Sequence, residues 1–403
     1  MIKHLFKLMW NRKRKNFLMM LEIFISFIVL FVALSILIFN IKNYSKPLGF
    51  SHKNVWLITM EWKDMEREEI AETLKQMKFV MEGYPEIEGN SLSRCYLFMP
   101  YTTSNGDFNY EGKETTIDYL MGEDEFPNVM DVKILDGRWF NDSDNAFNKI
   151  PVIINRNTEK NLFQGESALG KIFADNYDDS KKEFEVIGII DDFRNTGQFS
   201  TSKNVMFQRI NLNDDIDNIK YIRDSMLNRM LLKVKPGTGA DFEEILMKQL
   251  NLVAKGFDLK IQTAEDARKF SNKSMIILPL ILLIISGFLV INVALGLFGI
   301  IWYNINQRKS EIGLRRALGA PVRNIFIQIL GESIVLSTFS IILGLAVAIQ
   351  FPLLNFIGFI DVEIYYFSIT ATVISIYLVS LICALYPSKL ASDIQPAIAL
   401  HYE

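Results

Sequence analysis

Four apolar runs dominate this sequence, and a long polar stretch separates the first from the second. The first run covers Phe17–Phe39, and three more follow late in the chain at Met275–Tyr303, Ile325–Phe351 and Phe367–Tyr386. A helix that crosses a bilayer needs about 20 apolar residues, and each run is long enough. We therefore expect a membrane protein with four transmembrane α-helices in a 1+3 arrangement. A large domain, residues 40–273, then lies between helices 1 and 2 on one side of the membrane.

The first run has one alternative reading, a cleaved signal peptide, because basic residues precede it. Its apolar stretch is about 23 residues long, whereas the apolar core of a signal peptide has about 7–15, and no small-residue cleavage site follows it. We therefore expect an uncleaved membrane anchor.

Basic residues are concentrated in two segments next to these runs. Residues 1–16 carry Lys3, Lys7, Arg12, Lys13, Arg14 and Lys15 without an acid, and residues 304–323 carry Arg308, Lys309, Arg315, Arg316 and Arg323 against Glu311 alone. Positively charged short loops stay in the cytoplasm. We expect both termini, including the tail 387–403, to be cytoplasmic, and the large domain and the short loop 352–366 to lie outside.

The charge balance excludes one class of partner and favours another. Residues 40–273 have a net formal charge of −8, so the whole-chain value of −3 averages an acidic outer domain with basic inner segments. This average gives no indication of nucleic-acid binding. Basic residues beside a membrane favour contact with anionic lipid or with a protein partner.

Cysteine and histidine are too few and too scattered for a disulfide or a metal site. Cys95 lies in the outer domain and Cys383 in the fourth run, so the two cannot pair. His4, His52 and His401 stand far apart, and no His/Cys cluster has the spacing of metal ligands. We expect no disulfide, metal or cofactor.

The outer domain has the alternating pattern of an α/β fold with two lobes. Two strand–helix–strand units suit a split βαβ sheet. Their expected elements are Asn54–Met60, Met65–Gly83 and Arg94–Met99, and then Met230–Lys235, Ala240–Lys255 and Phe257–Thr263. Residues of about 100–183 are richer in Asn, Asp, Gly and aromatics, with short strands such as Val152–Asn155, and predict an inserted second lobe. Phe184–Ile190 is a further expected strand.

The second apolar run is longer than a bilayer requires. Residues 264–273 have helical character and lead directly into Met275–Tyr303. Either the helix is tilted in the membrane, or its extra turns project outward as a stalk that can transmit movement.

One glycine-rich string and two acidic groups resemble catalytic motifs but are not expected to act as such. Gly165–Lys171 matches G-x-x-x-x-G-K, but Ile172 replaces the Ser or Thr that a phosphate loop requires, and the preceding Asn157–Phe163 has helical character. The acidic groups Glu123–Glu125 and Asp191–Asp192 are expected to be solvated loops. We therefore expect no enzyme activity in this chain, and any ATP hydrolysis must occur in a partner.

Three polar residues lie within the apolar runs. Intramembrane carboxylates are costly and indicate function by default, so Glu22 and Glu332 are candidates for a proton or substrate path. Both lie near the cytoplasmic ends, where structural pairing with the basic segments is the competing reading. Asn292 is a candidate for an interhelical hydrogen bond, in a dimer seam or within the chain. It shares its helix with Gly287, Ala294, Gly296 and Gly299.

The inner loop is too amphipathic for a plain connector. Its segment Gln307–Pro321 places Glu311 and Arg315 four residues apart, which favours an ion pair on a helix. Ile312, Leu314 and Leu318 offer apolar contacts, and Gly319 with Pro321 ends the helix. Two readings are open: a basic interfacial helix that fixes topology, or a docking helix that fits a groove of a soluble partner.

This loop resembles the R-x-x-E-I-G-x-x-R-A-L-G-A segment of the MacB/FtsX-type permease family of ABC transporters. The matching residues are Arg308, Glu311, Ile312, Gly313, Arg316, Ala317, Leu318, Gly319 and Ala320. Further segments are similar to the family in the same order: Asn11–Asn16, Asp136–Phe140, Pro151–Ile172, Tyr386–Pro387 and Ile394–Leu400. Glu332 stands where family members often have a Glu early in the third span.

The resemblance implies a permease subunit that pairs with itself or with a similar subunit and binds separate ABC ATPase subunits. The inner loop would be the coupling helix, with the contact residues Arg308, Lys309, Glu311, Ile312, Gly313, Arg315, Arg316, Leu318, Gly319 and Ala320. ATP-driven motion would pass to the outer domain, which acts as a lever and can contact an outer protein partner. The family also implies the cytoplasmic (inner) membrane of a bacterium.

Several functions fit these expectations to different degrees. The first is export of antimicrobials, peptides or lipoproteins by mechanotransmission, and the second is a regulator that moves an outer partner such as a cell-wall hydrolase without transport. A sensor receptor would need a cytoplasmic output domain, and a membrane enzyme would need a catalytic set; the sequence offers neither. A candidate cargo that stimulates the ATPase would separate transport from regulation.

Overall fold

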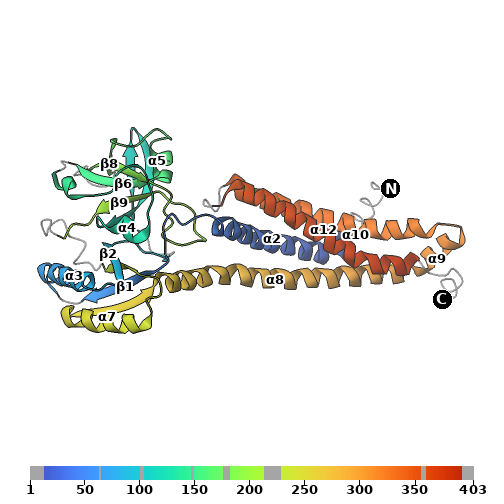
Figure 1. Cartoon of the computed structure of the whole chain (residues 1–403). Coiled ribbons are helices and arrows are strands. Elements are labelled where there is room, and N and C mark those ends of the chain that lie inside the picture. Colours follow the sequence, from blue (N-terminus) through green and yellow to red (C-terminus); the bar gives the residue numbers. More distant parts are fainter. Residues whose placement is uncertain are drawn as a thin grey trace. The chain divides into compact units, whose positions relative to one another are not determined.

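A computed structural model describes residues 13–62, 65–99, 104–146, 149–175, 182–212, 228–354 and 360–392. The expected N-terminal segment before Lys13 and the tail after Ser392 lie outside the described residues. The chain divides into two compact units, a helical unit of Met1–Lys42 with Met275–Glu403 and an α/β unit of Asn43–Ser274. Figure 1 labels their elements, and each unit is described by itself below.

The helical unit is built from four long helices. These are α2 (Lys13–Tyr44), α8 (Ala264–Gln307), α10 (Val322–Ala348) and α12 (Val362–Ser392). Each is long and apolar enough to cross a membrane, and the first is near the N-terminus. The expected 1+3 arrangement is therefore confirmed. Helix α8 begins at Ala264, within the α/β unit, and continues without interruption into the apolar run.

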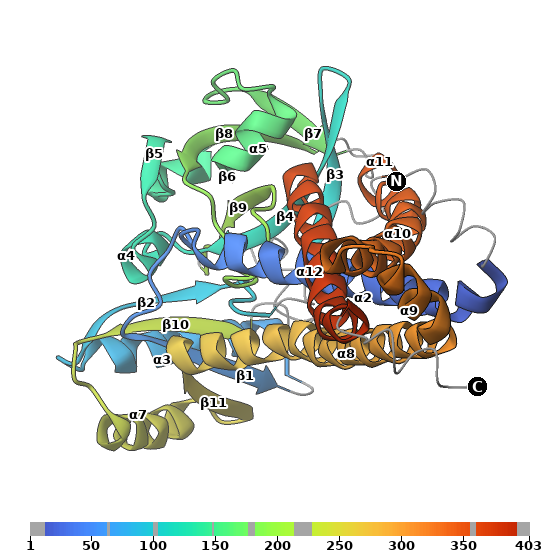
Figure 2. The same ribbon diagram turned by 90° about the vertical axis from the view of Figure 1, so that its right-hand side faces the viewer.

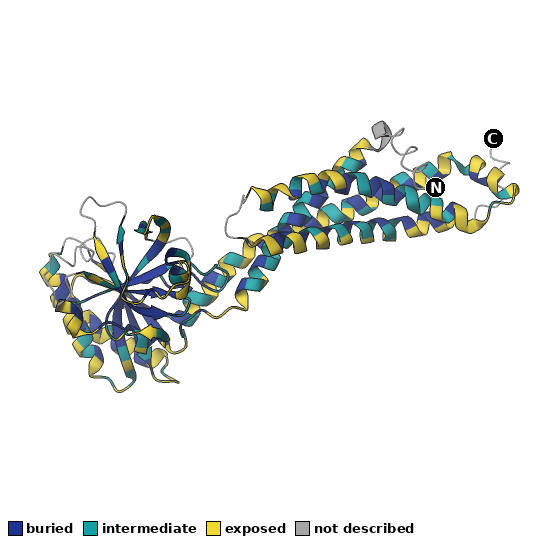
Figure 3. Cartoon of the chain, turned by 90° about the horizontal axis from the view of Figure 1, so that it is seen from above, coloured by how far each residue is buried: buried dark blue, intermediate teal, exposed yellow. Residues whose placement is uncertain are grey.

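Small and hydroxyl-bearing residues bring α10 and α12 side by side (Figures 1 and 2). The Oγ atoms of Ser337 and Ser380 lie 2.6 Å apart, and both side chains are fully buried. Thr338 Oγ1 lies 3.0 Å from the hydroxyl of Tyr377. Small residues allow close approach of membrane helices, and their hydroxyls bond across the interface. Figure 3 shows buried residues along the inner faces of these helices and exposed ones along their outer faces.

The first lobe of the α/β unit is a four-stranded antiparallel sheet in the order β11-β1-β10-β2. Its strands are β1 (Val55–Trp62), β2 (Ile87–Ser93), β10 (Arg229–Val234) and β11 (Phe257–Thr263). Helices α3 (Arg67–Glu82) and α7 (Ala240–Val253) connect β1 to β2 and β10 to β11. The order of the four strands is that of a split βαβ sheet, as the sequence predicts.

The helices of this lobe cover one shared core. Ile70, Leu74, Met77 and Met81 of α3 recur at helical spacing and are fully buried. They pack in the same cluster as Leu246 of α7 and the strand residues. An apolar stripe of this period is what fixes a helix on a sheet.

The expected strand Arg94–Met99 is wrong. These apolar residues form a buried loop after β2, in which Phe98 has a φ of +60° and its N–H donates to the carbonyl of Asn195 at 2.7 Å. Cys95, Leu97 and Phe98 fill a core cluster instead of a sheet. The strand is the more polar segment before it, β2, because pairing with β10 supplies its hydrogen bonds.

The second lobe is inserted between β2 and β10 and forms a closed ring of strands. Its elements are β3 (Asn105–Tyr110), β4 (Lys113–Gly122), α4 (Phe126–Met130), β5 (Ile134–Gly137), the 3-10 helix η1 (Asp142–Ala146), β6 (Ile150–Asn155), α5 (Arg156–Leu162), β7 (Ile172–Asp175), β8 (Glu183–Ile190) and β9 (Val205–Arg209). The pairings run β4-β3-β7-β8-β6-β9 and return to β4 (Figure 2). A closed ring leaves none of these strands as a free sheet edge.

The two lobes are joined by little backbone pairing. In the part of the chain that the structure describes, β2 pairs with β4 through Ser93 and Gly122. The second lobe extends to Arg209, so β8 and β9 belong to the ring. Polar side chains at the ends of β4 and β9 therefore lie close to the joint between the lobes.

Candidate functional site

The inner loop forms a short helix followed by a tight corner. Helix α9 (Lys309–Ala317) has Glu311 in its first turn and Arg315 in its last turn, which complements the helix dipole. Arg315 donates to Glu311 as the sequence predicts. Gly319 has a φ of +92°, a conformation that favours glycine at a helix end, and Pro321 precedes α10. The sequence therefore specifies a helix, a glycine stop and a new helix.

The apolar residues of α9 face two ways. Ile312 and Gly313 are buried against the rest of the helical unit. Leu314 and Leu318 are 51% and 80% exposed. The exposed leucines stand beside Arg315, which is also exposed. The helix therefore has an inner side that the chain itself covers and an outer side on which Leu314 and Leu318 are exposed.

Polar contacts connect this loop to α10. Arg308, the single residue between α8 and α9, donates through Nη1 to both carboxylate oxygens of Glu332, at 3.0 and 3.3 Å. Arg315 Nη1 donates to Gln328 Oε1 at 3.2 Å, and Gln328 Nε2 donates to Glu332 Oε1 at 3.4 Å. Glu332 is thus paired at the start of its span.

A cavity lies beneath these contacts. Its polar wall includes Arg308, Glu311, Gln328 and Glu332, and its apolar wall includes Leu297 of α8 and Met19 of α2. Arg315 also lines it, so the charged groups of the lining are two arginines and two glutamates. These charges balance, so the cavity does not select for one sign of charge.

The other intramembrane polar residues have different surroundings. Glu22 of α2 lies against α8, with its Oε2 3.1 Å from where a Cβ on Gly296 would be. Glycine therefore leaves the room that this carboxylate occupies. Asn292 donates to the carbonyl of Phe288 in its own helix at 2.9 Å and is half-buried.

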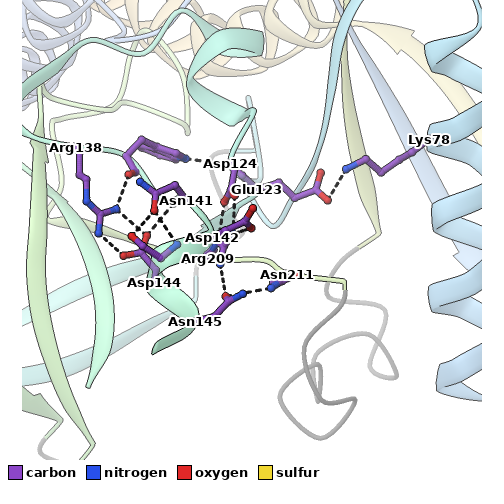
Figure 4. A network of polar contacts seen from close by, with 12 residues as sticks. Lys78, Glu123, Asp124, Arg138, Asn141, Asp142, Asp144, Asn145, Arg209 and Asn211 are labelled. Carbon is purple, nitrogen blue, oxygen red and sulfur yellow. Dashed lines mark hydrogen bonds and ion pairs between the residues drawn. The ribbon is translucent and has the colours of Figure 1, made fainter. Parts of the chain in front are cut away.

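In the α/β unit, the acidic group after β4 forms ion pairs at the joint between the lobes (Figure 4). Glu123 is buried and accepts from Nζ of Lys78 on α3 and from the backbone N–H of Leu92, both at 2.7 Å. Burial raises the pKa of Glu123, although Lys78 and Leu92 act in the opposite direction. The expectation that this group is a solvated loop is wrong for Glu123 and for its neighbour Asp124.

Arg209 at the end of β9 binds the other acids of this network. Its Nε and Nη2 donate to the two carboxylate oxygens of Asp124 at 2.7 and 2.6 Å, and Nη2 also reaches Asp142 at 3.0 Å. Hydrogen bonds to Asp124 raise the pKa of Arg209. Arg138 makes a second two-pronged pair with the buried Asp144. These carboxylates are engaged in structural pairs, so none is placed as a free acid or base.

The structure also excludes the phosphate-loop reading of Gly165–Lys171. This segment follows helix α5 and leads into strand β7, whereas a phosphate loop leads into a helix. Lys171 pairs with Glu166 and lies over the ring of Tyr110. Among the described residues, no group of three or more His, Cys, Asp or Glu is placed to hold a metal ion.

Sequence reasoning missed two residues that hold these polar networks together, Gln328 and Arg209. Gln328 stands four residues before Glu332, so both lie on one face of α10, and this spacing could have identified it. Arg209 is 85 residues from Asp124, and no local pattern connects them.

Two family models match separate parts of the chain. The MacB-like periplasmic core domain matches residues 17–245, and the FtsX-like permease C-terminal matches residues 283–396. The macrolide export ATP-binding/permease protein MacB of Bdellovibrio bacteriovorus is 22% identical over 321 residues, 78% of this chain and 48% of that protein. An uncharacterized ABC transporter permease of Methanocaldococcus jannaschii is 26% identical over 283 residues, 67% of this chain and 66% of that protein.

Among solved structures, the periplasmic region of MacB from Actinobacillus actinomycetemcomitans is similar. It has a TM-score of 0.38 and 17% identity and covers 57% of this chain and 97% of that one. The chain spans about half the length of the macrolide exporters that it matches. The core-domain match alone covers more than half of the chain. The chain therefore belongs to the FtsX-like permeases with a MacB-like periplasmic core domain, a family of multi-pass ABC transporter permeases.

Proposed function

We propose that this chain is the permease subunit of an exporter that works by mechanotransmission, with α9 as the coupling helix that meets the ATPase. One observation carries the proposal: Leu314 and Leu318 are exposed on the outer side of the loop, while Ile312 anchors the inner side of α9. An amphipathic helix of this kind fits a groove on a partner. The charged groups Glu311 and Arg316 complete the contact, together with Lys309 and Ala320.

The ATPase is a separate subunit in this proposal. The Methanocaldococcus relative, whose name is that of a permease alone, supports this arrangement. The cargo class is that of antimicrobials, peptides or lipoproteins, and the macrolide exporters among the relatives support the first of these.

A second permease subunit, the same chain or a similar one, is also part of the proposal. In the most apolar stretch of α8, 11% of the residues are buried, whereas the corresponding share is 33–39% in the other three long helices. Gly287 and Gly299 of α8 have no heavy atom within 4 Å of an added Cβ among the contacts that the structure describes. With the half-buried Asn292, they would allow a second helix to approach closely.

Replacing Glu311, Arg315 and Arg316 by Ala tests the coupling role. We expect the association of the ATPase with the permease to fall at least tenfold, because about 1.4 kcal/mol of lost contact energy suffices for that change. Co-purification and ATP hydrolysis of the complex in nanodiscs measure it.

The matched control for this triple variant is Glu244→Ala with Lys248→Ala, an exposed i,i+4 ion pair on α7 of the outer domain. This control should leave association unchanged. Normal association of the triple variant would contradict the role of α9.

Orientation in the cytoplasmic membrane is the second test. Cysteines at Lys255 and Ser310, both exposed, report on the two sides of the membrane. We expect an impermeant maleimide to label position 255 in intact cells and position 310 only after permeabilisation. Native Cys95 should stay unlabelled because it is buried and burial raises the pKa of its thiol; Cys383 is replaced by Ala. Labelling in the reverse order would invert the proposed topology.

A further inference from the structure

The contacts of α9 with its two neighbouring helices differ in kind. Toward α10, it is held by a chain of side-chain bonds from Arg308 through Glu332 and Gln328 to Arg315. Toward α8, the connection is Arg308 itself, whose backbone has φ −109° and ψ 15°, outside the α-helical region. A single non-helical residue is a joint at which two helices can change their angle.

The cavity beneath the loop lies on the same side as that joint. Its walls come from α2 and from the last turns of α8, facing α9 and the first turns of α10. Side chains that border an empty cavity lack partner atoms on that side, so they lack the dispersion contacts that would resist movement. Around this cavity, the packing of α9 and the first turns of α10 against α2 and α8 is therefore looser than the packing along the α10–α12 contact.

The contact between α10 and α12 is tightly packed. Ser337, Ser340, Ser368, Thr372 and Ser380 are fully buried there. Hydroxyl bonds cross the contact at Ser337–Ser380 and Thr338–Tyr377. Close-packed helices with buried bonds between them move as one body.

We propose that α9, α10 and α12 form one rigid body, and that the Arg308–Glu332 ion pair is the positioning contact that holds α9 on α10. A push on α9 is then delivered to the α10–α12 pair, and the joint at Arg308 lets this body turn relative to α8. This inference rests on the proposed function and adds the route of the force within the membrane.

The burial of the Arg308–Glu332 ion pair, called the clamp below, suits a contact that holds α9 on α10. The side chains of Arg308 and Glu332 are only 19% and 14% exposed, so the surrounding water screens their attraction little. Removing one partner would leave a charge in a costly place. Glu332 is thus a positioning residue, since it acts through Arg308 and Gln328 and not on a substrate.

A reversible cross-link tests the clamp in the complete complex with its ATPase in nanodiscs. Cys95 and Cys383 are first replaced by Ala, and Arg308→Cys with Glu332→Cys is then joined by a short bifunctional thiol reagent that dithiothreitol cleaves. We expect at least a fivefold loss of permease-dependent ATP hydrolysis without the cross-link and recovery of more than half with it. Cleavage should remove the recovery. Glu332→Gln, which keeps the side-chain shape, should lower permease-dependent ATP hydrolysis about threefold.

Two outcomes would overturn the clamp. An uncross-linked variant that stays fully coupled shows that the pair carries no force, and a cross-linked variant that is inactive shows that the pair must open during the cycle. Association with the ATPase should stay within twofold throughout, because neither residue is on the outer side of α9. Failure of the proposed function looks different: association would then be insensitive to the Glu311, Arg315 and Arg316 triple variant.

Distances between spin labels show directly which helices move together. These distances would not change if the Arg308–Glu332 pair only stabilised the fold. Labels at the exposed Ser310 and Asn324 lie on α9 and α10, and a label at the exposed Tyr303 lies on α8. On ATP binding, we expect the 310–324 distance to stay constant and the 303–324 distance to change. A change in the first distance with constancy of the second would place α9 with α8 and contradict the proposal. Labelled subunits are diluted with unlabelled ones so that each pair reports within one chain.

Discussion

A leucine at position 344 should push α2 away from α10 and destabilise the whole helical unit. A Cβ on Gly344 would lie 2.4 Å from Cδ1 and 2.8 Å from Cγ of Phe27. Phe27 is fully buried in the core that α2 shares with α8, α10 and α12, so its ring has no free space to enter. Overpacking of such a core costs about 1–3 kcal/mol for added methylenes, and Leu adds four carbons.

The measurement is the thermal unfolding of the purified chain in detergent. We expect Gly344→Leu to lower the apparent Tm by about 5–10 °C, since 1 kcal/mol corresponds to about 2–4 °C in a domain of this size. Gly344→Ala should show a smaller loss in the same direction. The control is Ala346→Leu on the exposed side of α10, which should leave the Tm unchanged. An unchanged Tm for Gly344→Leu would show that α2 does not pack on α10 through Phe27.

Loss of the Arg209 side chain should loosen the second lobe of the outer domain where β9 meets the turn after β4. Arg209 binds Asp124 with two parallel bonds and also reaches Asp142 and Asn145 (Figure 4). Removing one partner of a buried ion pair costs about 3–5 kcal/mol. Asp124 is 37% exposed and regains some hydration, so we expect about 2–4 kcal/mol for Arg209→Ala.

Hydrogen exchange of the full chain detects this change locally. Amides of β9 and of the turn after β4 should exchange at least tenfold faster, since 1.4 kcal/mol of local stability corresponds to tenfold. Arg209→Lys should recover only part of the protection, because a lysine cannot make the two-pronged contact. Arg156→Ala, at an exposed position of α5, is the control and should have no effect. Unchanged exchange in Arg209→Ala would show that these ion pairs do not hold β9 to the turn after β4.

Periodic segments of the fold could be predicted from the sequence because their signals are local. The apolar stripe of α3 and the alternation of β11 each identify an element without reference to the rest of the chain. The Glu311–Arg315 pair is of the same kind, since four residues of helix place the two side chains together. The stop at Gly319 follows from the freedom of glycine alone.

Residues 87–99 show where this reasoning fails. The apolar run Arg94–Met99 predicts a strand, and the polar run Ile87–Ser93 does not, but the structure has them the other way round. A strand needs a partner for its hydrogen bonds, and only the fold supplies β10 beside β2. Similarly, the acids after β4 look like a solvated loop until Lys78 and Arg209 are brought to them from α3 and β9.

Composition and short periods in the sequence predict the four spans, their 1+3 spacing, the second strand–helix–strand unit and the amphipathic loop at Gln307–Pro321. All of these depend on composition and on periods of a few residues. Only the tertiary structure decided the closed ring of the second lobe, the ion pairs at its joint and the pairing of Glu332 with Arg308. The ion pairs Arg308–Glu332, Lys78–Glu123 and Arg209–Asp124 join residues 24, 45 and 85 positions apart in the chain. Their formation depends on which elements the fold places side by side, and a local pattern does not contain that information.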